Sequence, residues 1–95
     1  MFKITRNKGF HITFENGYTV SVQFGPGNYC QNYDAEIGSA EEESAAEGSD
    51  TAECAVWGPD SGMIAHPAFD GDTVGGYMTP ADVLKLLNWA EEQAA

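Results

Sequence analysis

The first 24 residues alternate between apolar and polar side chains with a period of two. Three runs, at residues 2–5, 10–14 and 18–24, place β-branched or aromatic residues at every second position. Such alternation is typical of strands that bury one face. Asn16-Gly17 lies between the second and third runs and predicts a two-residue type I′ turn, in which both central residues have positive φ. We therefore expect a three-stranded antiparallel meander.

The C-terminal segment carries the signals of an amphipathic helix. Thr79 is a suitable N-cap, Pro80 occupies the first helical position, and Asp82 follows three residues after the cap. Apolar residues then recur at helical spacing from Val83 to Ala90. Because an apolar stripe must be buried, we expect this helix to pack on one face of the sheet.

Shorter apolar runs fill the region before the helix. Residues 52–57 and 63–66 resemble strands, and residues 73–78 form a weaker run in which Tyr77 and Met78 could make an exposed patch. Together with the meander, these runs predict an α+β fold: an antiparallel sheet of five or six strands with one C-terminal helix packed on one face. The length of 95 residues corresponds to a single domain.

Charge is distributed unevenly along the chain. There are 15 Asp and Glu residues against 4 Lys and Arg, which gives a net charge of −11. From Gly9 to Leu84 there is no Lys or Arg, and this stretch holds 13 of the acidic residues. Such a balance excludes ordinary binding to phosphate backbones and disfavours adsorption to anionic membranes. We expect a basic protein surface as the partner, with no direct contact to nucleic acid or membrane.

Most of the acidic residues lie in residues 34–53, which are rich in Ala, Ser and Gly and nearly free of large apolar side chains. This composition predicts a mobile acidic loop. The loop either serves only to keep the protein soluble or forms a contact surface for a basic partner. Under the second interpretation the candidate partner-binding residues are Asp34, Glu36, Glu41, Glu42, Glu43, Glu47, Asp50 and Glu53. A rigid contact surface, which would avoid the entropic cost of ordering a loop, would instead use Asp60, Asp70, Asp72 and Asp82.

Residues 24–33, with the sequence FGPGNYCQNY, form the most distinctive local run. Its glycines do not match a phosphate-binding loop, because the lysine and the following helix of that motif are missing. One interpretation is a glycine turn followed by an aromatic arm that packs on the sheet. The other is a recognition loop, since Tyr and Asn make polar contacts at modest entropic cost. The candidate recognition residues are Asn28, Tyr29, Asn32 and Tyr33.

The residues that could carry chemistry form no recognised pattern. Cys30 and Cys54 lack the spacing of a metal motif, and an acidic environment raises the pKa of a thiol. The sequence allows a disulfide between them, but we expect reduced thiols because there is no signal peptide. His66 with Asp70 and Asp72 could outline a metal site, but their spacing matches no known ligand set. The sequence therefore predicts no catalytic residue, no metal and no cofactor. A small-molecule binder or enzyme that uses His66 and the 25–33 loop is a further hypothesis.

The N-terminus lacks the apolar segment of a signal peptide, and no apolar run reaches the roughly 20 residues that span a bilayer. We therefore expect a cytoplasmic location. In its size, its acidity and its lack of catalytic motifs, the chain resembles small acidic phage-encoded proteins, such as anti-CRISPR proteins and other DNA-mimic inhibitors. This resemblance rests on size and charge, not on a family motif. It implies a non-catalytic protein that blocks a basic nucleic-acid-binding surface of a host-defence protein. The alternative is a small structural or oligomerising protein, such as a homodimer, with no inhibitory role.

Overall fold

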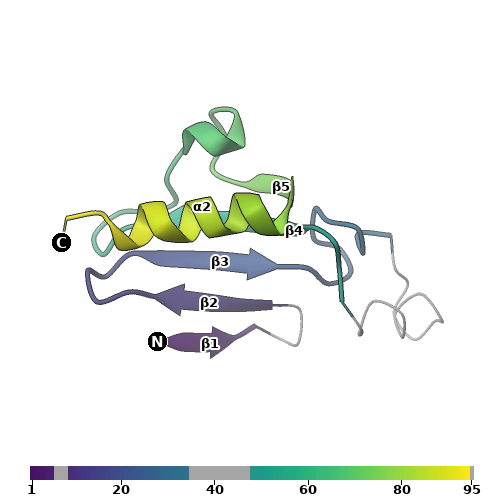
Figure 1. Ribbon diagram of the computed structural model, residues 1–95, viewed down its shortest axis with the longest axis horizontal. Coiled ribbons are helices and arrows are strands. Elements are labelled where there is room, and N and C mark those ends of the chain that lie inside the picture. The colour runs from purple at the N-terminus through teal and green to yellow at the C-terminus, as the bar shows by residue number, and fades with distance from the viewer. Residues whose placement is uncertain (6–8, 35–47, 95) are drawn as a thin grey trace.

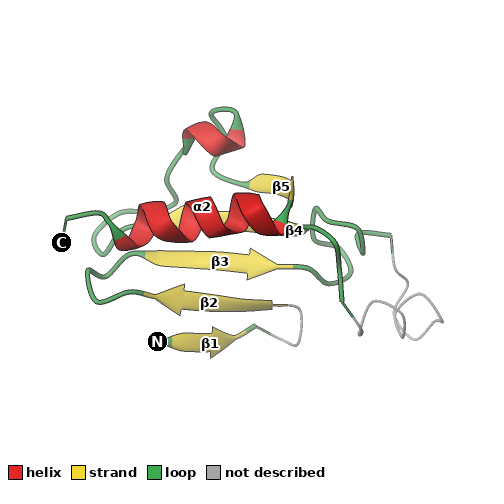
Figure 2. Cartoon of the chain, viewed as in Figure 1, coloured by secondary structure: helices red, strands yellow, loops and turns green. Residues whose placement is uncertain are grey.

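The computed structural model describes residues 1–5, 9–34 and 48–94, and it has an α+β architecture in two layers (Figure 1). Within these residues five strands form one antiparallel sheet, and one α-helix packs on one of its faces (Figure 2). The strands follow one another across the sheet in chain order. The predicted α+β fold is therefore confirmed. The elements are β1 (Phe2–Ile4), β2 (Gly9–Thr13), β3 (Thr19–Gln23), β4 (Ala52–Trp57), the 3-10 helix η1 (Pro67–Phe69), β5 (Gly75–Met78) and α2 (Pro80–Glu91).

The register of the sheet gathers the apolar residues of the meander on one face. In β2 and β3, Phe10 lies opposite Val22 and Ile12 lies opposite Val20. Cys54 of β4 continues the first of these rows. Since successive side chains of a strand point to opposite faces, Thr and Ser residues occupy the other face. The core on the helix side consists of Val20, Val22, Ala52, Cys54, Val56, Phe69, Met78, Leu86 and Ala90.

Helix α2 begins where the sequence predicts. The backbone N–H of Asp82 donates to Thr79 Oγ1 at 3.2 Å, and the backbone N–H of Thr79 donates to the Asp82 carboxylate at 3.0 Å. These reciprocal bonds form a capping box, and hydrogen bonding of the Asp82 carboxylate to Thr79, first of all to its backbone N–H, lowers the pKa of Asp82. Leu86 and Ala90 are the buried residues of the helix.

The turn between β2 and β3 differs from the prediction. Gly17 has a φ of 87°, whereas in the described part of the chain the non-glycine residues with positive φ are Asp70 and Tyr77. Asn16 therefore lacks the conformation that a type I′ turn requires, and the predicted two-residue turn is wrong. The Phe14 carbonyl accepts from Gly17 N–H at 2.9 Å, which closes a turn with the glycine in the left-handed position.

The side chain of Asn16 explains why this turn is used. Its Nδ2 donates to the carbonyl oxygens of Ala90 at 2.8 Å and of Gln93 at 2.9 Å. Its Oδ1 accepts from the Tyr18 N–H at 3.0 Å. An α-helix leaves its last carbonyls without partners, and the last turn of α2 carries no basic residue that could contact them. Asn16 therefore caps α2 from the β2–β3 turn.

We expect Asn16→Ala to lower the free energy of unfolding by about 1–2 kcal/mol, because helix carbonyls lose their donor. Urea denaturation measures this change. Asn88→Ala is the matched control, since Asn88 is an exposed residue of α2, and it should leave stability unchanged or slightly higher. Equal stabilities for the Asn16 variant and the wild type would show that water replaces the amide without cost.

The predicted short strand at residues 63–66 is also wrong. Met63 forms only an isolated bridge with Trp57, and Ile64 N–H donates to the Val56 carbonyl at 2.8 Å. The chain then turns into η1, because His66 Nδ1 accepts from the Ala68 N–H at 3.0 Å and caps it. Phe69 of this turn is buried against β5, where a Cβ on Gly75 would lie 2.3 Å from its ring. That position therefore requires glycine.

Candidate partner-binding site

The two asparagines of the predicted recognition loop hold the loop in place. Asn32 Nδ2 donates to the Phe24 carbonyl at 2.8 Å and to the Gly48 carbonyl at 3.1 Å. Asn28 Oδ1 accepts from the Gly25 N–H at 3.2 Å. These bonds join the segment after β3 to the segment before β4. Both amides are therefore occupied by the fold itself.

Two of the predicted partner-binding carboxylates also anchor this loop. Glu53, at the start of β4, accepts from the Tyr29 N–H at 3.0 Å and is half-buried. Asp50 makes two bonds with Gln31, whose Oε1 accepts from the Asp50 N–H at 2.8 Å and whose Nε2 donates to the carboxylate at 3.3 Å. Asp50 is nevertheless exposed, as is Asp34. The bonds fix Asp50 without removing it from the surface.

The tyrosine side chains of this region are exposed to solvent. Tyr29 and Tyr33 are 51% and 41% exposed, and their rings stack with centroids 5.4 Å apart. Tyr77 is 57% exposed, and its N–H donates to the Tyr29 carbonyl at 2.8 Å. Its φ of 53° is unfavourable for a bulky side chain, by about 1–2 kcal/mol. By contrast Met78, predicted to share an exposed patch with Tyr77, is buried in the core.

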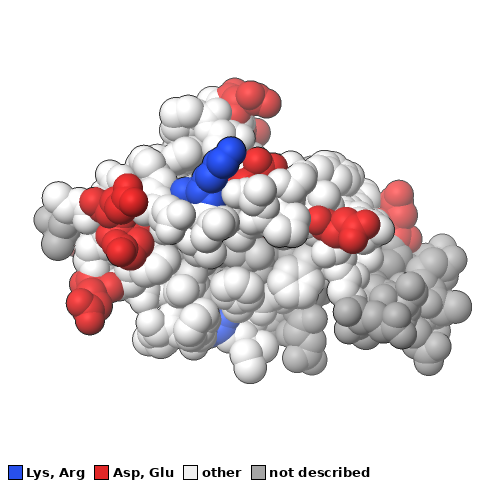
Figure 3. Space-filling view, in the orientation of Figure 1, with Lys and Arg blue, Asp and Glu red and all other residues white. Residues whose placement is uncertain are grey.

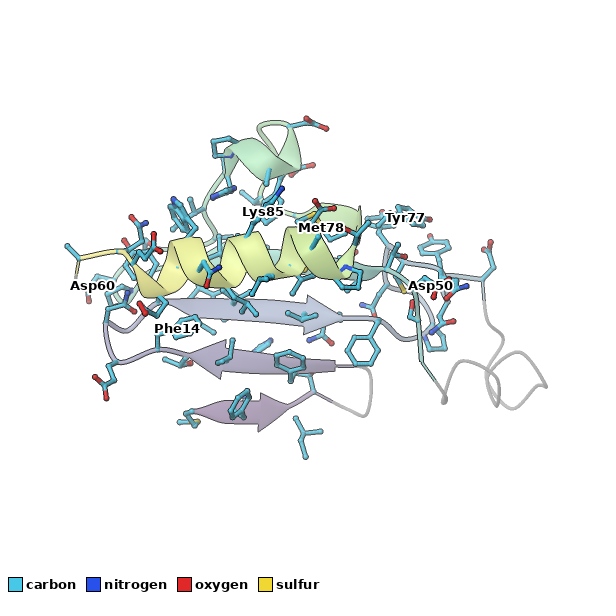
Figure 4. The ribbon with its side chains drawn as sticks, viewed as in Figure 1. Phe14, Asp50, Asp60, Tyr77, Met78 and Lys85 are labelled. Atoms are coloured by element: carbon cyan, nitrogen blue, oxygen red, sulfur yellow. The ribbon has the colours of Figure 1, made fainter. Side chains whose placement is uncertain are left out.

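Aromatic and acidic side chains thus lie toward one end of the sheet, where Figure 4 labels both Asp50 and Tyr77. A carboxylate beside an exposed aromatic ring favours a guanidinium or ammonium group, which pairs with the first and lies over the second. We call this surface the aromatic–acidic end; it consists of Tyr29, Tyr33, Asp34, Asp50 and Tyr77.

The described part of the chain carries ten carboxylate residues and two lysines, Lys3 and Lys85. All ten are exposed except Glu53 and Asp82, which are half-buried. In Figure 3 they are spread over both ends of the molecule, and Figure 4 places Asp60 at the end opposite Asp50. Their summed field is negative, and such a field attracts positively charged surfaces over a distance.

The remaining predicted contact residues cannot be placed. Glu36, Glu41, Glu42, Glu43 and Glu47 lie outside the described residues. The predicted mobile loop at 34–53 falls mostly there, although its last two residues, Ala52 and Glu53, belong to β4.

Both cysteines are free and buried. Burial, followed by the charges of Glu53 and Asp82, raises the pKa of Cys54 to about 12. Acidic neighbours, the cause expected from the sequence, contribute less to this raised pKa than removal of the thiol from water. Cys54 is therefore a thiol at neutral pH and a poor nucleophile.

The histidines are engaged in packing. His66 caps η1 and its ring meets Trp89 edge-on, with centroids 4.6 Å apart. His11 meets Trp57 in the same way at 5.2 Å. Burial and the nearby Lys3 charge lower the pKa of His11. Within residues 1–5, 9–34 and 48–94, no three His, Cys, Asp or Glu side chains gather as metal ligands would.

Comparison of the chain with protein-family models, with curated proteins and with solved structures gives no match. Among the described helices, none is long and apolar enough to cross a membrane.

The sequence analysis missed Gln31, which fixes Asp50. No local signal could have identified it, because the two residues are 19 positions apart and are brought together only by the fold.

Proposed function

We propose that this chain is a non-catalytic acidic binding protein that occupies a basic, nucleic-acid-binding surface of a partner protein. The observation that carries the proposal is the aromatic–acidic end, where exposed carboxylates and exposed tyrosine rings occur at the same end of the sheet. Surfaces that bind nucleic acid present Arg and Lys to phosphates. In the proposed complex Asp34 and Asp50 take the place of phosphates, and the tyrosines lie against guanidinium groups.

The anchoring of this end also supports the proposal. Asp50 is held by Gln31, and the backbone of Tyr29 is held by Glu53. Groups that are already ordered lose less entropy on binding, so more of the contact energy becomes affinity. The mechanism is electrostatic: long-range attraction steers the partner's basic surface to the acidic chain, and short-range contacts then select it.

Our proposal extends to the biological role. An acidic protein seated on such a surface blocks nucleic acid by competition. We propose that the target is a host-defence protein, such as a nucleic-acid-binding component of a CRISPR system. The chain would then act as a phage-encoded inhibitor in the cytoplasm of the host cell. The support for this step is the resemblance in size and charge to DNA-mimic inhibitors.

The proposal is tested by capturing the partner from host lysate on the immobilised full chain at low salt. We expect to capture a protein that binds nucleic acid and releases it when the chain is added. The affinity of this protein for the chain should fall at least tenfold between about 50 and 300 mM NaCl. Affinity that does not change with salt would contradict charge mimicry.

Charge-neutral variants locate the contact. Asp34→Asn with Asp50→Asn should weaken binding of the captured protein roughly tenfold, because both carboxylates belong to the aromatic–acidic end. Asp60→Asn with Asp70→Asn changes the net charge by the same amount elsewhere and should weaken it by no more than about twofold. Equal losses for the two pairs would show that only total charge matters.

A structural or oligomerising protein is the second candidate, favoured by the exposed apolar residues Phe2 and Ile4 on the edge strand β1. Light scattering separates the two candidates. A stable dimer that captures no basic protein would favour the second.

A further inference from the structure

Helix α2 covers only part of the sheet. It packs against β3, β4 and β5, and among residues 1–5, 9–34 and 48–94 no second helix lies over β1 and β2 (Figure 1). Neighbouring strands lie about 4.8 Å apart, so five strands span roughly 20 Å, whereas a helix is about 10 Å across. One helix therefore covers about half of a five-stranded sheet.

The uncovered half is apolar. Phe2 and Ile4 are 75% and 78% exposed, and both lie on the helix side of the sheet because Phe2 is opposite Ile12 and Ile4 is opposite Phe10. The rings of Phe2 and Phe10 meet edge-on with centroids 6.2 Å apart. We call these four residues the uncovered apolar face.

A groove of about 280 Å³ continues this face toward α2. Phe10 and Phe24 line it from the sheet, and Leu84 and Leu87 line it from the helix. Leu84 is 58% exposed, so the helix side of the groove presents apolar surface next to that of the uncovered apolar face. The face and the groove together form a surface with room for a second helix beside α2, and we call this surface the seat.

We propose that the uncovered apolar face and its groove bind an amphipathic, basic α-helix of the partner protein. This inference deepens the proposed function and rests on it for the basic character of the partner. Packed helices lie 8–10 Å apart, so a helix beside α2 would sit over β1 and β2. The 12 residues of α2 extend for about 18 Å, and a partner helix of about three turns matches that length.

Charge at the two ends of the seat sets the chemistry of the partner helix. Asp50 lines the groove at one end. Glu15 and Glu91 line a second hollow, together with Phe14, at the β2–β3 turn. In Figure 3 the surface just below α2 is white, a small blue area shows among the lower strands, and acidic side chains lie toward either end. Lys3 lies on the opposite face, since it alternates with Phe2 and Ile4. A helix with an apolar stripe and Lys or Arg at its ends is complementary to this pattern.

A second copy of the chain fits the seat less well. The outer side of α2 carries exposed Lys85, Asn88 and Glu92, which are unsuited to an apolar face. Each copy has a net charge of −11, so the copies repel each other.

Pairing of two copies through their β1 edges also leaves the uncovered apolar face open. The Met1 carbonyl accepts from Thr13 N–H, and Thr5 N–H donates to the Gly9 carbonyl, so the free backbone groups of β1 are those of Phe2 and Ile4. Edge pairing would satisfy those groups and set side chains of the second copy beside Phe2 and Ile4, but it would leave the face open from above.

Titration of the isotope-labelled full chain with a synthetic Leu/Lys amphipathic peptide of about 14 residues tests the inference by NMR. We expect saturable shifts in β1, β2 and residues 83–87. A Leu/Glu peptide with the same apolar stripe should bind at least tenfold more weakly. Equal binding of the two peptides, or shifts confined to other elements, would overturn the inference.

Substitutions in the uncovered apolar face provide a second test of the inference. Phe2→Ser with Ile4→Ser should weaken binding of the Leu/Lys peptide at least tenfold, because the face loses its most exposed apolar groups. Lys3→Gln, on the same strand but the opposite face, is the matched control and should stay within about twofold. Leu84→Ser changes the helix side of the groove and should also weaken peptide binding. Because Leu84 is on α2, this result does not depend on whether Phe2→Ser with Ile4→Ser detaches β1 from the sheet.

The two proposals fail in different ways. If the face variants keep wild-type affinity for both the peptide and the captured partner, the helix seat is overturned while salt-dependent binding at the aromatic–acidic end stands. If the chain captures no basic partner, the proposed function fails whatever the peptide does. A dimer that the Phe2/Ile4 variant converts to monomer, with no peptide shifts, would make a second copy the occupant and overturn the inference.

Discussion

Replacement of Leu86 by alanine should lower the free energy of unfolding by about 2–5 kcal/mol. Leu86 is 2% exposed and belongs to the same buried cluster as Val20 and Val56 of the sheet. The substitution removes buried methyl groups and leaves a cavity between the two layers. Because α2 is the one α-helix among the described residues, no other α-helix in that part of the chain can take over the contact.

Leu84→Ala is the matched control, since it makes the same chemical change on the same helix at a side chain that is 58% exposed. It should cost less than about 1 kcal/mol. Urea denaturation of the two variants and the wild type measures the difference. Similar losses for the two leucines would contradict the packing of α2 described above.

The size of the expected effect matters for a domain this small. A chain of 95 residues is stable by about 5–14 kcal/mol, so the loss of one core leucine removes a large share of the total. A binding assay on Leu86→Ala would therefore mix lost stability with any lost contact, whereas Leu84→Ala should affect binding with little loss of stability. Position 84 is the better probe of the groove.

The parts of the fold that could be predicted are those with local signals. The alternation at residues 2–24 depends on neighbouring residues, and the capping box joins Thr79 to Asp82 only three positions away. Contacts between residues far apart in the sequence could not be predicted, and Asn16 is the example. Its amide bonds to carbonyls 74 and 77 positions further along the chain, and this contact accompanies the change of turn type that sequence reasoning got wrong.

The same limit applies to the candidate site. The exposed tyrosines and Asp34 and Asp50 could be identified by residue type. The structural roles of Asn28 and Asn32 could not, because Asn and Asp suit loop hydrogen bonds and recognition equally well. Glu53 is similar: within the acidic run it is one of eight carboxylates, and only the fold directs it to the backbone of Tyr29.

Stability should fall steeply above pH 9 because of Cys54. Burial, then the charges of Glu53 and Asp82, raises the pKa of this thiol from 9.0 to about 12 in the folded chain. In the unfolded chain the thiol loses its proton near pH 9, so between pH 9 and 12 the unfolded state is the one that gains from ionisation. This difference in ionisation lowers the free energy of unfolding by about 1.4 kcal/mol per pH unit, which is on the order of 4 kcal/mol between pH 9 and 12. Below pH 9 the thiol is protonated in both states and contributes no pH dependence.

Urea denaturation of the wild type and of Cys54→Ala at intervals from pH 8 to pH 12 isolates this contribution. Tyrosines and lysines titrate in the same range, but they are present in both proteins and cancel in the difference. We expect the alanine variant to be less stable at pH 8, because a buried group is lost, and to become the more stable of the two near pH 12. Cys30→Ala, at the other buried cysteine, should retain the alkaline loss that Cys54 causes. Curves for wild type and Cys54→Ala that stay parallel over the whole range would show that the Cys54 thiol ionises as readily in the folded chain as in the unfolded one, and would place it in contact with water.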